Sequence, residues 1–406
     1  MERFVQTSPD SALMNADDAY QSGQTLFFSQ ERQFVGEGLA AHFQMPATQL
    51  DAAWLMSVLR QSTQIGLARK VLFAILPFDS SDQAWVNIPQ LVFDRSFGAI
   101  AETPKLTGDV ALDSNIQVSD IVSQLSPCEY AQMVQKALWA IDRARFEKVV
   151  LARSLNFAAT IDIAVLVNQL VAKQRSGYQF AFPCTPNCLQ AQTQISTWVG
   201  ASPELLLAKK GSRVFSNPLA GSIPRIADEA EDRLRAQNLL QSAKDLHEHH
   251  LVVKEVERVL QPFCRELHVP KTPELLKTPT MWHLSTPIEG VLYDAHLSSL
   301  ILAQALHPTP AVCGYPTAAA QSFIRAHEGF ERELFTGVVG WHDEQGDGEW
   351  AVTIRCAKVS AAQVQVYAGA GIVAGSEPDS EVRETRAKMQ TILNIMGIAE
   401  ALAGAR

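Results

Sequence analysis

The sequence has little charge, few cysteines and no basic excess. Charged residues make up 19% of the 406 residues, and the formal net charge is −9, which argues against nucleic acid or an anionic membrane as the main partner. The six cysteines are scattered. Cys184 and Cys188 do not have the two-residue spacing of a redox motif or zinc knuckle. Reduced thiols in a cytoplasmic protein are therefore expected.

Long apolar runs are also missing. The run at 71–78 is of strand length and too short to span a bilayer. The first residues lack the basic region and apolar core of a signal peptide. Hydrophobic residues still make up 47% of the chain, an ordinary value for a globular protein. We therefore expect a soluble cytoplasmic protein.

Strand and helix patterns are mixed along the chain, with a polar connection at 101–125. Helices are expected at 50–60, 129–145, 161–173, 230–260 and from 380 onward. Strands are expected at 25–29, 71–78, 85–93, 148–157, 178–182, 195–200, 205–209, 282–286, 337–342, 349–357 and 364–367. Many strands joined by short turns, with helices outside, predict one large α+β domain.

The closing segment combines a strand, a glycine-rich bend and a helix capped by Ser380. At 100° per residue, Glu381, Glu384 and Lys388 fall on the side that continues into apolar residues, and Arg383 and Arg386 fall on the opposite side. Charges that face inward are costly unless something neutralises them. A solvated acidic first turn is one interpretation. A divalent cation held by the carboxylates, with an anion near Lys388, is the other.

The glycines of this segment resemble a dinucleotide fingerprint only superficially. Gly369 and Gly371 are followed by Gly375, one position too late, and no acidic residue on a following strand is expected. The glycines are better explained by close approach of the backbone to a ligand.

The long expected helix carries Glu248 in the run His247-Glu-His-His250, which lacks the His-Glu-x-x-His spacing of a zinc helix. Its predicted apolar stripe comprises Leu239, Ala243, Leu246, His250 and Val253, so Glu248 would point to one side of the buried seam. It is either a surface charge or a partner of Glu381 and Glu384.

Three further charged residues stand in apolar surroundings. Lys148 begins a strand, where it is either an edge residue or a buried general base. Glu204 follows a Ser-Pro turn and is either a turn acid or, in an apolar pocket, a general acid. Arg355, predicted in mid-strand, needs a carboxylate partner.

Several motifs in order along residues 125–397 resemble those of the chorismate-utilising enzymes, isochorismate synthases of the siderophore pathways in particular. They include Lys148-Val-Val-Leu-Ala-Arg, Gly200-Ala-Ser-Pro-Glu, Asn217-Pro-Leu-Ala-Gly-Ser, Lys244-Asp-Leu-His-Glu-His, Leu306-His-Pro-Thr-Pro-Ala, Thr353-Ile-Arg, Tyr367-Ala-Gly-Ala-Gly and Glu381-x-x-Glu-x-x-x-Lys. The resemblance implies one domain built on large antiparallel sheets surrounded by helices. Residues 1–125 would be its N-terminal sheet-forming part and 126–400 its chorismate-binding catalytic region.

The resemblance also implies roles. Glu248 and Glu384 would bind Mg²⁺, with Glu381 a ligand or a water-mediated one. Lys148 would be the base that activates water, and Glu204 the acid that protonates the leaving hydroxyl. The expected substrate-binding residues are Gly221, Ser222, His283, Ala311, Arg355, Gly369 and Lys388.

Departures from relatives narrow the activity. Ala220 stands where aminodeoxychorismate synthases carry lysine, and Ala311 where aminating relatives tend to carry threonine. The alanine at 311 favours water over ammonia as the nucleophile. A monomer without a glutamine amidotransferase subunit is also expected. Val382 stands where many isochorismate synthases carry tryptophan. Salicylate synthase, a menaquinone-pathway isochorismate synthase and a non-catalytic chorismate- or metal-binding protein remain as alternatives.

The proposed base gives the first testable prediction. Lys148→Ala should abolish turnover of chorismate while the protein stays folded, because the alanine cannot take a proton from water. Steady-state rates and circular dichroism measure the two outcomes. A near-normal rate would remove Lys148 as the base.

Overall fold

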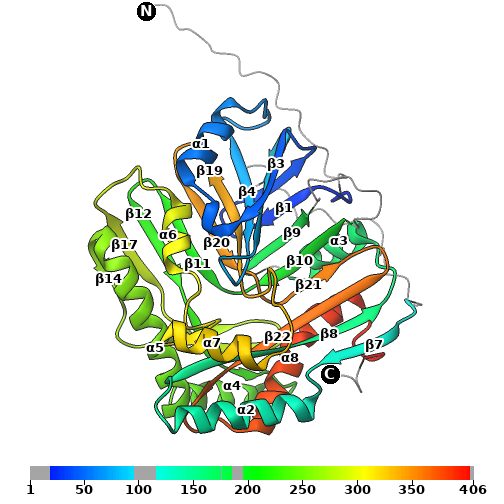
Figure 1. The fold of residues 1–406 in the computed structure, drawn as a ribbon, viewed down its shortest axis with the longest axis vertical. Coiled ribbons are helices and arrows are strands. Elements are labelled where there is room, and N and C mark those ends of the chain that lie inside the picture. The colour runs from blue at the N-terminus through cyan, green and yellow to red at the C-terminus, as the bar shows by residue number, and fades with distance from the viewer. Residues whose placement is uncertain (1–18, 96–115, 175, 185–194, 403–406) are drawn as a thin grey trace, which may run out of the picture.

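Two large antiparallel sheets form the centre of the molecule, and helices cover their outer faces (Figure 1). The structure is a computed structural model, and it describes residues 19–95, 116–174, 176–184 and 195–402. The α+β class and the single domain with large antiparallel sheets, both expected from the sequence, are confirmed.

The first sheet has ten strands, and its long central pair is β8 and β22. Its order is β18 (Gly314–Tyr315), β8 (Lys148–Ala158), β22 (Gln363–Val373), β21 (Cys356–Val359), β10 (Ser196–Ser202), β9 (Tyr178–Cys184), β1 (Thr25–Phe28), β2 (Gln33–Glu37) and β6 (Leu91–Asp94), with β7 (Ser119–Gln124) also paired to β8. β8 is buried over nearly its whole length, as expected of a strand covered on both faces.

The second sheet has nine strands, and a three-stranded sheet lies beside it. The nine run β14 (Cys264–His268), β17 (Ile288–Leu292), β12 (Arg213–Asn217), β11 (Leu205–Lys210), β20 (Gly348–Val352), β19 (Val338–Asp343), β4 (Val71–Leu76), β5 (Gln83–Ile88) and β3 (Ala41–Pro46). The small sheet runs β13 (Leu219–Pro224), β16 (Met281–Ser285) and β15 (Glu274–Lys277).

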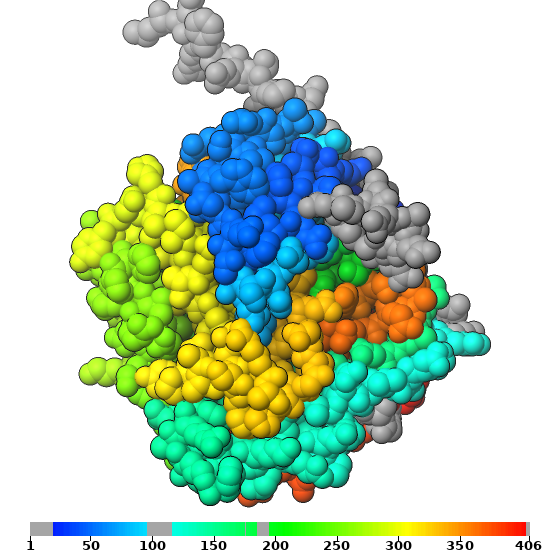
Figure 2. All heavy atoms as spheres, viewed as in Figure 1, coloured from blue at the N-terminus to red at the C-terminus, as the bar shows by residue number. Residues whose placement is uncertain are grey.

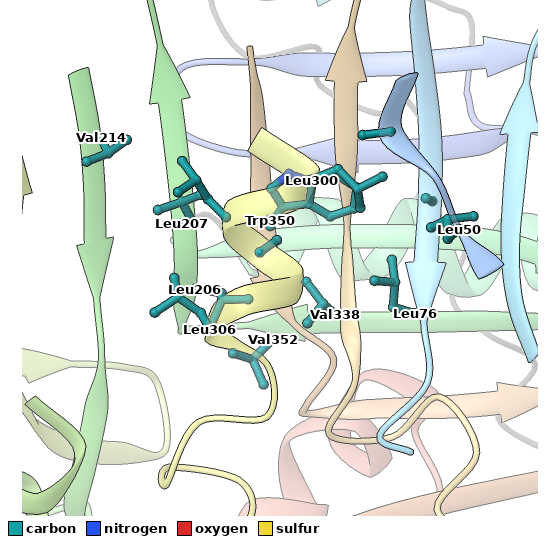
Figure 3. Packing of buried hydrophobic residues seen from close by; sticks show 14 of the residues in the cluster. Leu50, Leu76, Leu206, Leu207, Val214, Leu300, Leu306, Val338, Trp350 and Val352 are labelled. Atoms are coloured by element: carbon teal, nitrogen blue, oxygen red, sulfur yellow. The ribbon is translucent and has the colours of Figure 1, made fainter. Parts of the chain in front are cut away.

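Apolar side chains fill the layers between these elements. Aromatic residues of both large sheets, such as Phe73, Phe180 and Trp341, pack in one cluster between them. In Figure 3, α6 (Ser299–Leu306) lies across the nine-stranded sheet, and Leu300 and Leu306 pack beside Trp350 of β20.

The other helices cover the remaining outer surfaces. α1 (Ala52–Gln61) and α5 (Ala243–Leu260) pack in the same apolar cluster as α6. α3 (Ile163–Lys173) and α8 (Pro378–Met396) pack on the ten-stranded sheet. α2 (Pro127–Ile141) packs with α7 (Thr317–His327). α4 (Glu229–Leu239) and the short 3₁₀ helices at Ala47–Gln49 and Gln261–Phe263 complete the described helices. None of the helices in the described residues is both long and apolar enough to cross a membrane.

Strands from the first 125 residues enter both large sheets: β1, β2, β6 and β7 the ten-stranded one, and β3, β4 and β5 the nine-stranded one. The division of the chain at residue 125 stays a prediction. The expected polar connection at 101–125 is wrong at its end, where β7 pairs with β8. The rest of that connection, 101–115, lies outside the described residues.

Three expected elements are divided in the structure. The helix expected at 230–260 is two helices, because Ser242 caps α5 through the Asp245 amide. The strand expected at 85–93 is β5 and β6, separated by Pro89 and Gln90. The strand expected at 349–357 is interrupted before β21, since Arg355 has a φ of 51°.

The closing segment also differs from the prediction. The glycine-rich bend is absent among the described residues, because β22 continues through Gly369 and Gly371 to Val373. α8 begins at Pro378 rather than after Ser380; Glu377 occupies the cap position without a side-chain hydrogen bond, and proline suits the first helical turn. The predicted face is correct: Glu381 is buried, whereas Arg383 and Arg386 are exposed.

Candidate active site

A cleft is lined by β8 and β22 of the ten-stranded sheet, by β13 and β16 of the small sheet, and by α5 and α8. It encloses about 650 Å³ that protein atoms do not fill, part of it open to solvent. Ten of the predicted site residues line it: Glu204, Gly221, Ser222, Glu248, His283, Ala311, Arg355, Gly369, Glu384 and Lys388. The other two, Lys148 and Glu381, are buried behind its wall, with 0% and 1% of their surface exposed.

Each of the three glutamates predicted to bind metal forms an ion pair with a lysine. The pairs are Glu248 with Lys148 at 2.9 Å, Glu381 with Lys244 at 2.8 Å and Glu384 with Lys388 at 2.6 Å between nitrogen and oxygen. Buried carboxylates require such counter-charges. No three acidic, histidine or cysteine side chains of the described residues are grouped closely enough to hold a metal ion by themselves.

Glu381 and Glu384 differ in the direction of their pKa values although they lie one helical turn apart. Burial, and then the charge of Glu384, raises the pKa of Glu381 to about 7 against the opposing effect of Lys244. Burial also opposes ionisation of Glu384. The charge and hydrogen bond of Lys388, together with Lys244 and the Ser222 hydroxyl, outweigh it and lower the pKa of Glu384.

Gly371 of β22 makes room for the pair formed by Lys148 and Glu248. A Cβ at this position would overlap Glu248 Oε1 and come within 3.1 Å of Lys148 Cε. The Lys148 Nζ makes no well-directed hydrogen bond to the described residues, although it lies 2.9 Å from Glu248 Oε1. The pair is therefore mainly a contact of charges, and replacing Lys148 removes the counter-charge of Glu248.

Glu204 lies at the turn between β10 and β11, where the sequence forms a Ser-Pro-Glu bend. Its amide donates to Ser202 Oγ at 3.2 Å, and its Oε1 accepts from the Leu219 amide at 3.4 Å. Burial raises the pKa of Glu204 to about 7, against the lowering effects of that amide and of the cationic Lys148 and Arg355. A carboxyl of this kind can be protonated near neutral pH.

Arg355 and His283 present buried nitrogens to the cleft. Arg355 makes no ion pair within the described part of the chain, and burial lowers its pKa to about 10. Its positive φ aims it from a strained backbone position. Burial also holds the pKa of His283 well below its usual value, and its Nε2 has no hydrogen-bond partner among the described residues. The imidazole is thus neutral.

Sequence reasoning missed several parts of the cleft. Lys244 lies one helical turn before Glu248, a spacing that places both on one helix face, yet its partner Glu381 is 137 residues away. Phe335 and Tyr367 line the wall and stack at 4.9 Å between ring centroids. Nothing in the local sequence of Phe335 indicated this.

The predicted apolar stripe of α5 is wrong. His250 is exposed, whereas Glu248, His249 and Val252 are buried. The break before Ser242 affects only Leu239, because the other stripe residues belong to α5, whose inward face is instead that of Glu248, Val252 and Val256. His249 lies in the seam, between the Ala220 carbonyl at 3.1 Å and the Thr286 hydroxyl at 2.6 Å.

The fold and the cleft have close relatives. The family model described as "Chorismate binding enzyme" matches residues 95–397. The vibriobactin-specific isochorismate synthase of Vibrio cholerae is 42% identical over 377 residues, which cover 92% of this chain and 91% of that protein. The chain therefore belongs to the chorismate-binding enzymes.

Two further comparisons concern relatives named as isochorismate synthases. Isochorismate synthase DhbC of Bacillus subtilis is 42% identical over 85% of both chains. The solved structure of the DhbC protein of Bacillus anthracis superposes with a TM-score of 0.83 at 38% identity, covering 93% of this chain and 97% of that one. Within its family the chain groups with the isochorismate synthases.

The raised pKa of Glu204 gives a pH-dependent stability. Between its ordinary pKa of 4.5 and its folded value of about 7, the folded state holds more protons than the unfolded state, so the free energy of unfolding falls as pH rises through this window. Glu204→Gln abolishes this contribution. The Tm of the variant minus that of the wild type should increase across the window and stay level above it. A difference that does not vary with pH would contradict the assignment.

Gly371→Ala tests the close approach of β22 to the pair. The added methyl group should displace Glu248 and destabilise the fold by about 1–3 kcal/mol, the usual range for overpacking. Gly369→Ala is the matched control, since its Cβ would come no closer than 3.0 Å to another atom. Chemical denaturation compares the two variants. Equal effects would show that Gly371 has no special role.

Proposed function

We propose that this chain is a Mg²⁺-dependent isochorismate synthase that adds water at C2 of chorismate and removes the C4 hydroxyl. The observation that carries the proposal is the placement of a buried lysine and a buried glutamic acid at one cleft with two cationic anchors. Lys148 comes from β8 and Glu204 from the turn between β10 and β11, whereas Lys388 and Arg355 come from α8 and the turn before β21.

Two carboxylates of chorismate need two cationic sites. Arg355 would bind the enolpyruvyl carboxylate near Gly369, because its guanidinium faces the cleft without an ion pair in the described chain. Lys388, with Gly221 and Ser222, would bind the ring carboxylate. Neutral His283 and Ala311 would line the ring.

The carboxylates fit a magnesium ion by their donor chemistry. Mg²⁺ prefers oxygen ligands and usually keeps several waters, so one or two protein carboxylates suffice. Glu248 and Glu384 line the cleft and would hold it, while Glu381, paired with Lys244, would lie behind them. The bound ion would neutralise charge and orient the ring carboxylate.

The chemistry divides between the base and the acid. In the reacting state Lys148 would be a neutral amine that takes a proton from water as the water oxygen bonds to C2, and both ring double bonds shift towards C4. The bond between C4 and its oxygen breaks, and Glu204 donates the proton with which that oxygen leaves as water. Water is a poor nucleophile and hydroxide a poor leaving group, so both steps need proton transfer. The pKa of Glu204, about 7, supports its role as the acid.

The cellular role follows from the relatives. The names of the relatives from Vibrio cholerae and Bacillus species support a role in siderophore biosynthesis in the cytoplasm. The enzyme would act as a monomer, with water as nucleophile and no amidotransferase subunit.

One assay tests the activity. Purified protein incubated with chorismate and Mg²⁺ should form isochorismate, and chelation of the metal should stop the reaction. Chromatography separates the products, and Glu204→Gln should lower kcat by about 100-fold or more. Salicylate with pyruvate would instead identify a salicylate synthase, and no turnover would favour a binding protein.

A further inference from the structure

Strand β8 has one edge that no strand completes. β22 pairs with it along its whole length. On the other edge, β18 pairs only with Lys148 and Val149, the Cys313 carbonyl just before it accepts from the Val150 amide at 2.8 Å, and β7 pairs from Ser154 onward. Between them, of the described strands, none pairs with β8. The buried backbone groups of this gap need partners, because unpaired ones are costly.

The side chains of Glu328 and Arg332 take the place of the missing strand. The Ala152 amide donates to Glu328 Oε1 at 2.7 Å, and Arg332 Nη2 donates to the Val150 carbonyl at 2.7 Å. Arg332 Nε donates to Glu328 Oε2 at 2.8 Å, and Nη2 also contacts Oε1. Both side chains are almost fully buried: 2% of the Arg332 side chain and 1% of the Glu328 side chain are exposed.

The same guanidinium reaches two other segments of the cleft wall. Arg332 Nη1 donates to the Val312 carbonyl at 2.8 Å and to Thr336 Oγ1 at 3.3 Å. Val150, Val312 and Thr336 all line the cleft. One side chain therefore connects the strand of Lys148, the loop of Ala311 and the wall at Thr336. In Figure 2 the residues of α7 and of the loop before it (gold) lie between the N-terminal strands (blue) and α2.

The proposed substrate anchors and metal ligands belong to other elements. Lys388 and Glu384 lie on α8, Glu248 on α5 and Gly221 on β13, and Glu328 and Arg332 form no hydrogen bond or ion pair with them among the described residues. The pair thus holds the wall that carries the base and leaves the anchors to other contacts.

We propose that the buried pair of Glu328 and Arg332 is a positioning device that fixes the strand of Lys148 against the loop of Ala311 for water attack. This inference rests on the proposed isochorismate synthase activity. A misplacement of about 1 Å can cost on the order of 100-fold in rate. Loss of the pair should therefore lower kcat and leave KM nearly unchanged, since substrate binding depends on the anchors.

Arg332→Lys tests the geometry while it keeps the charge. Lysine has one nitrogen and cannot reach the carbonyls of Val150 and Val312 from the separate positions of Nη2 and Nη1. We expect kcat for chorismate to fall about 100-fold, with KM within about threefold and an unchanged affinity for Mn²⁺ used as a probe ion. Arg325→Lys is the matched control: it lies near the end of α7, pairs with Asp79 and is 57% exposed. It should behave as the wild type.

A second variant is needed in case the Arg332→Lys protein does not fold. Glu328→Gln with Arg332→Met removes both charges, so no buried charge is left unpaired, a replacement that cores often tolerate. It should show the same fall in kcat. Folded protein with wild-type kcat in either variant would overturn the proposal, as would a loss located entirely in KM.

Amide hydrogen exchange separates this inference from the proposed function. In both variants, exchange should quicken at the Ala152 amide and in the loop at 306–316, and stay unchanged in α5 and α8. Unchanged exchange at Ala152 would overturn the positioning role whatever the reaction. If the variants show this exchange pattern but the wild-type protein does not convert chorismate, the proposed function is contradicted and the positioning role is not.

Discussion

The requirement that buried carboxylates meet counter-charges governs how this cleft is built. Three glutamates lie at or behind its wall, and each pairs with a lysine. Two of the pairs join different elements: β8 to α5 through Lys148 and Glu248, and α5 to α8 through Lys244 and Glu381. An isolated charge would be strongly destabilising there. The ion pairs therefore link the placement of these elements to the electrostatics of the site.

The same requirement gives chemically identical side chains different properties. Glu204 and Glu381 have pKa values of about 7 because burial dominates, whereas Lys388 and other partners lower the pKa of Glu384. Groups whose environments push their pKa values apart are suited to different roles. Glu384 is suited to bind a cation, and Glu204 to hold a proton near neutral pH.

Local pattern was enough to predict part of the structure. The periodicity of the last helix correctly placed Glu381 inward and Arg383 outward, since a helix face depends only on residue spacing. Nine of the ten predicted residues that line the cleft stand in motifs quoted from the sequence, and His283 is the tenth. The failures arose where tertiary structure overrides local pattern. The positive φ of Arg355 interrupts the strand expected there. Ser242 caps a new helix within a stretch that the sequence pattern predicts as one helix.

Contacts between distant segments had no local signal at all. Glu328 matters because β18 and β7 leave a gap along β8, and a gap is a property of the assembled sheet. Its partner Arg332 bonds to backbone carbonyls, which every residue type offers, so the sequence of the bonded segments carries no trace of the contact. The cleft thus has two supports of different origin. Ion pairs link the helices to each other and to β8 on the side of the glutamates, and the side chains of Glu328 and Arg332 hold the wall that carries Lys148. Because the Glu328–Arg332 pair shares no direct hydrogen bond or ion pair with these three pairs within the described chain, its mutation should leave them in place.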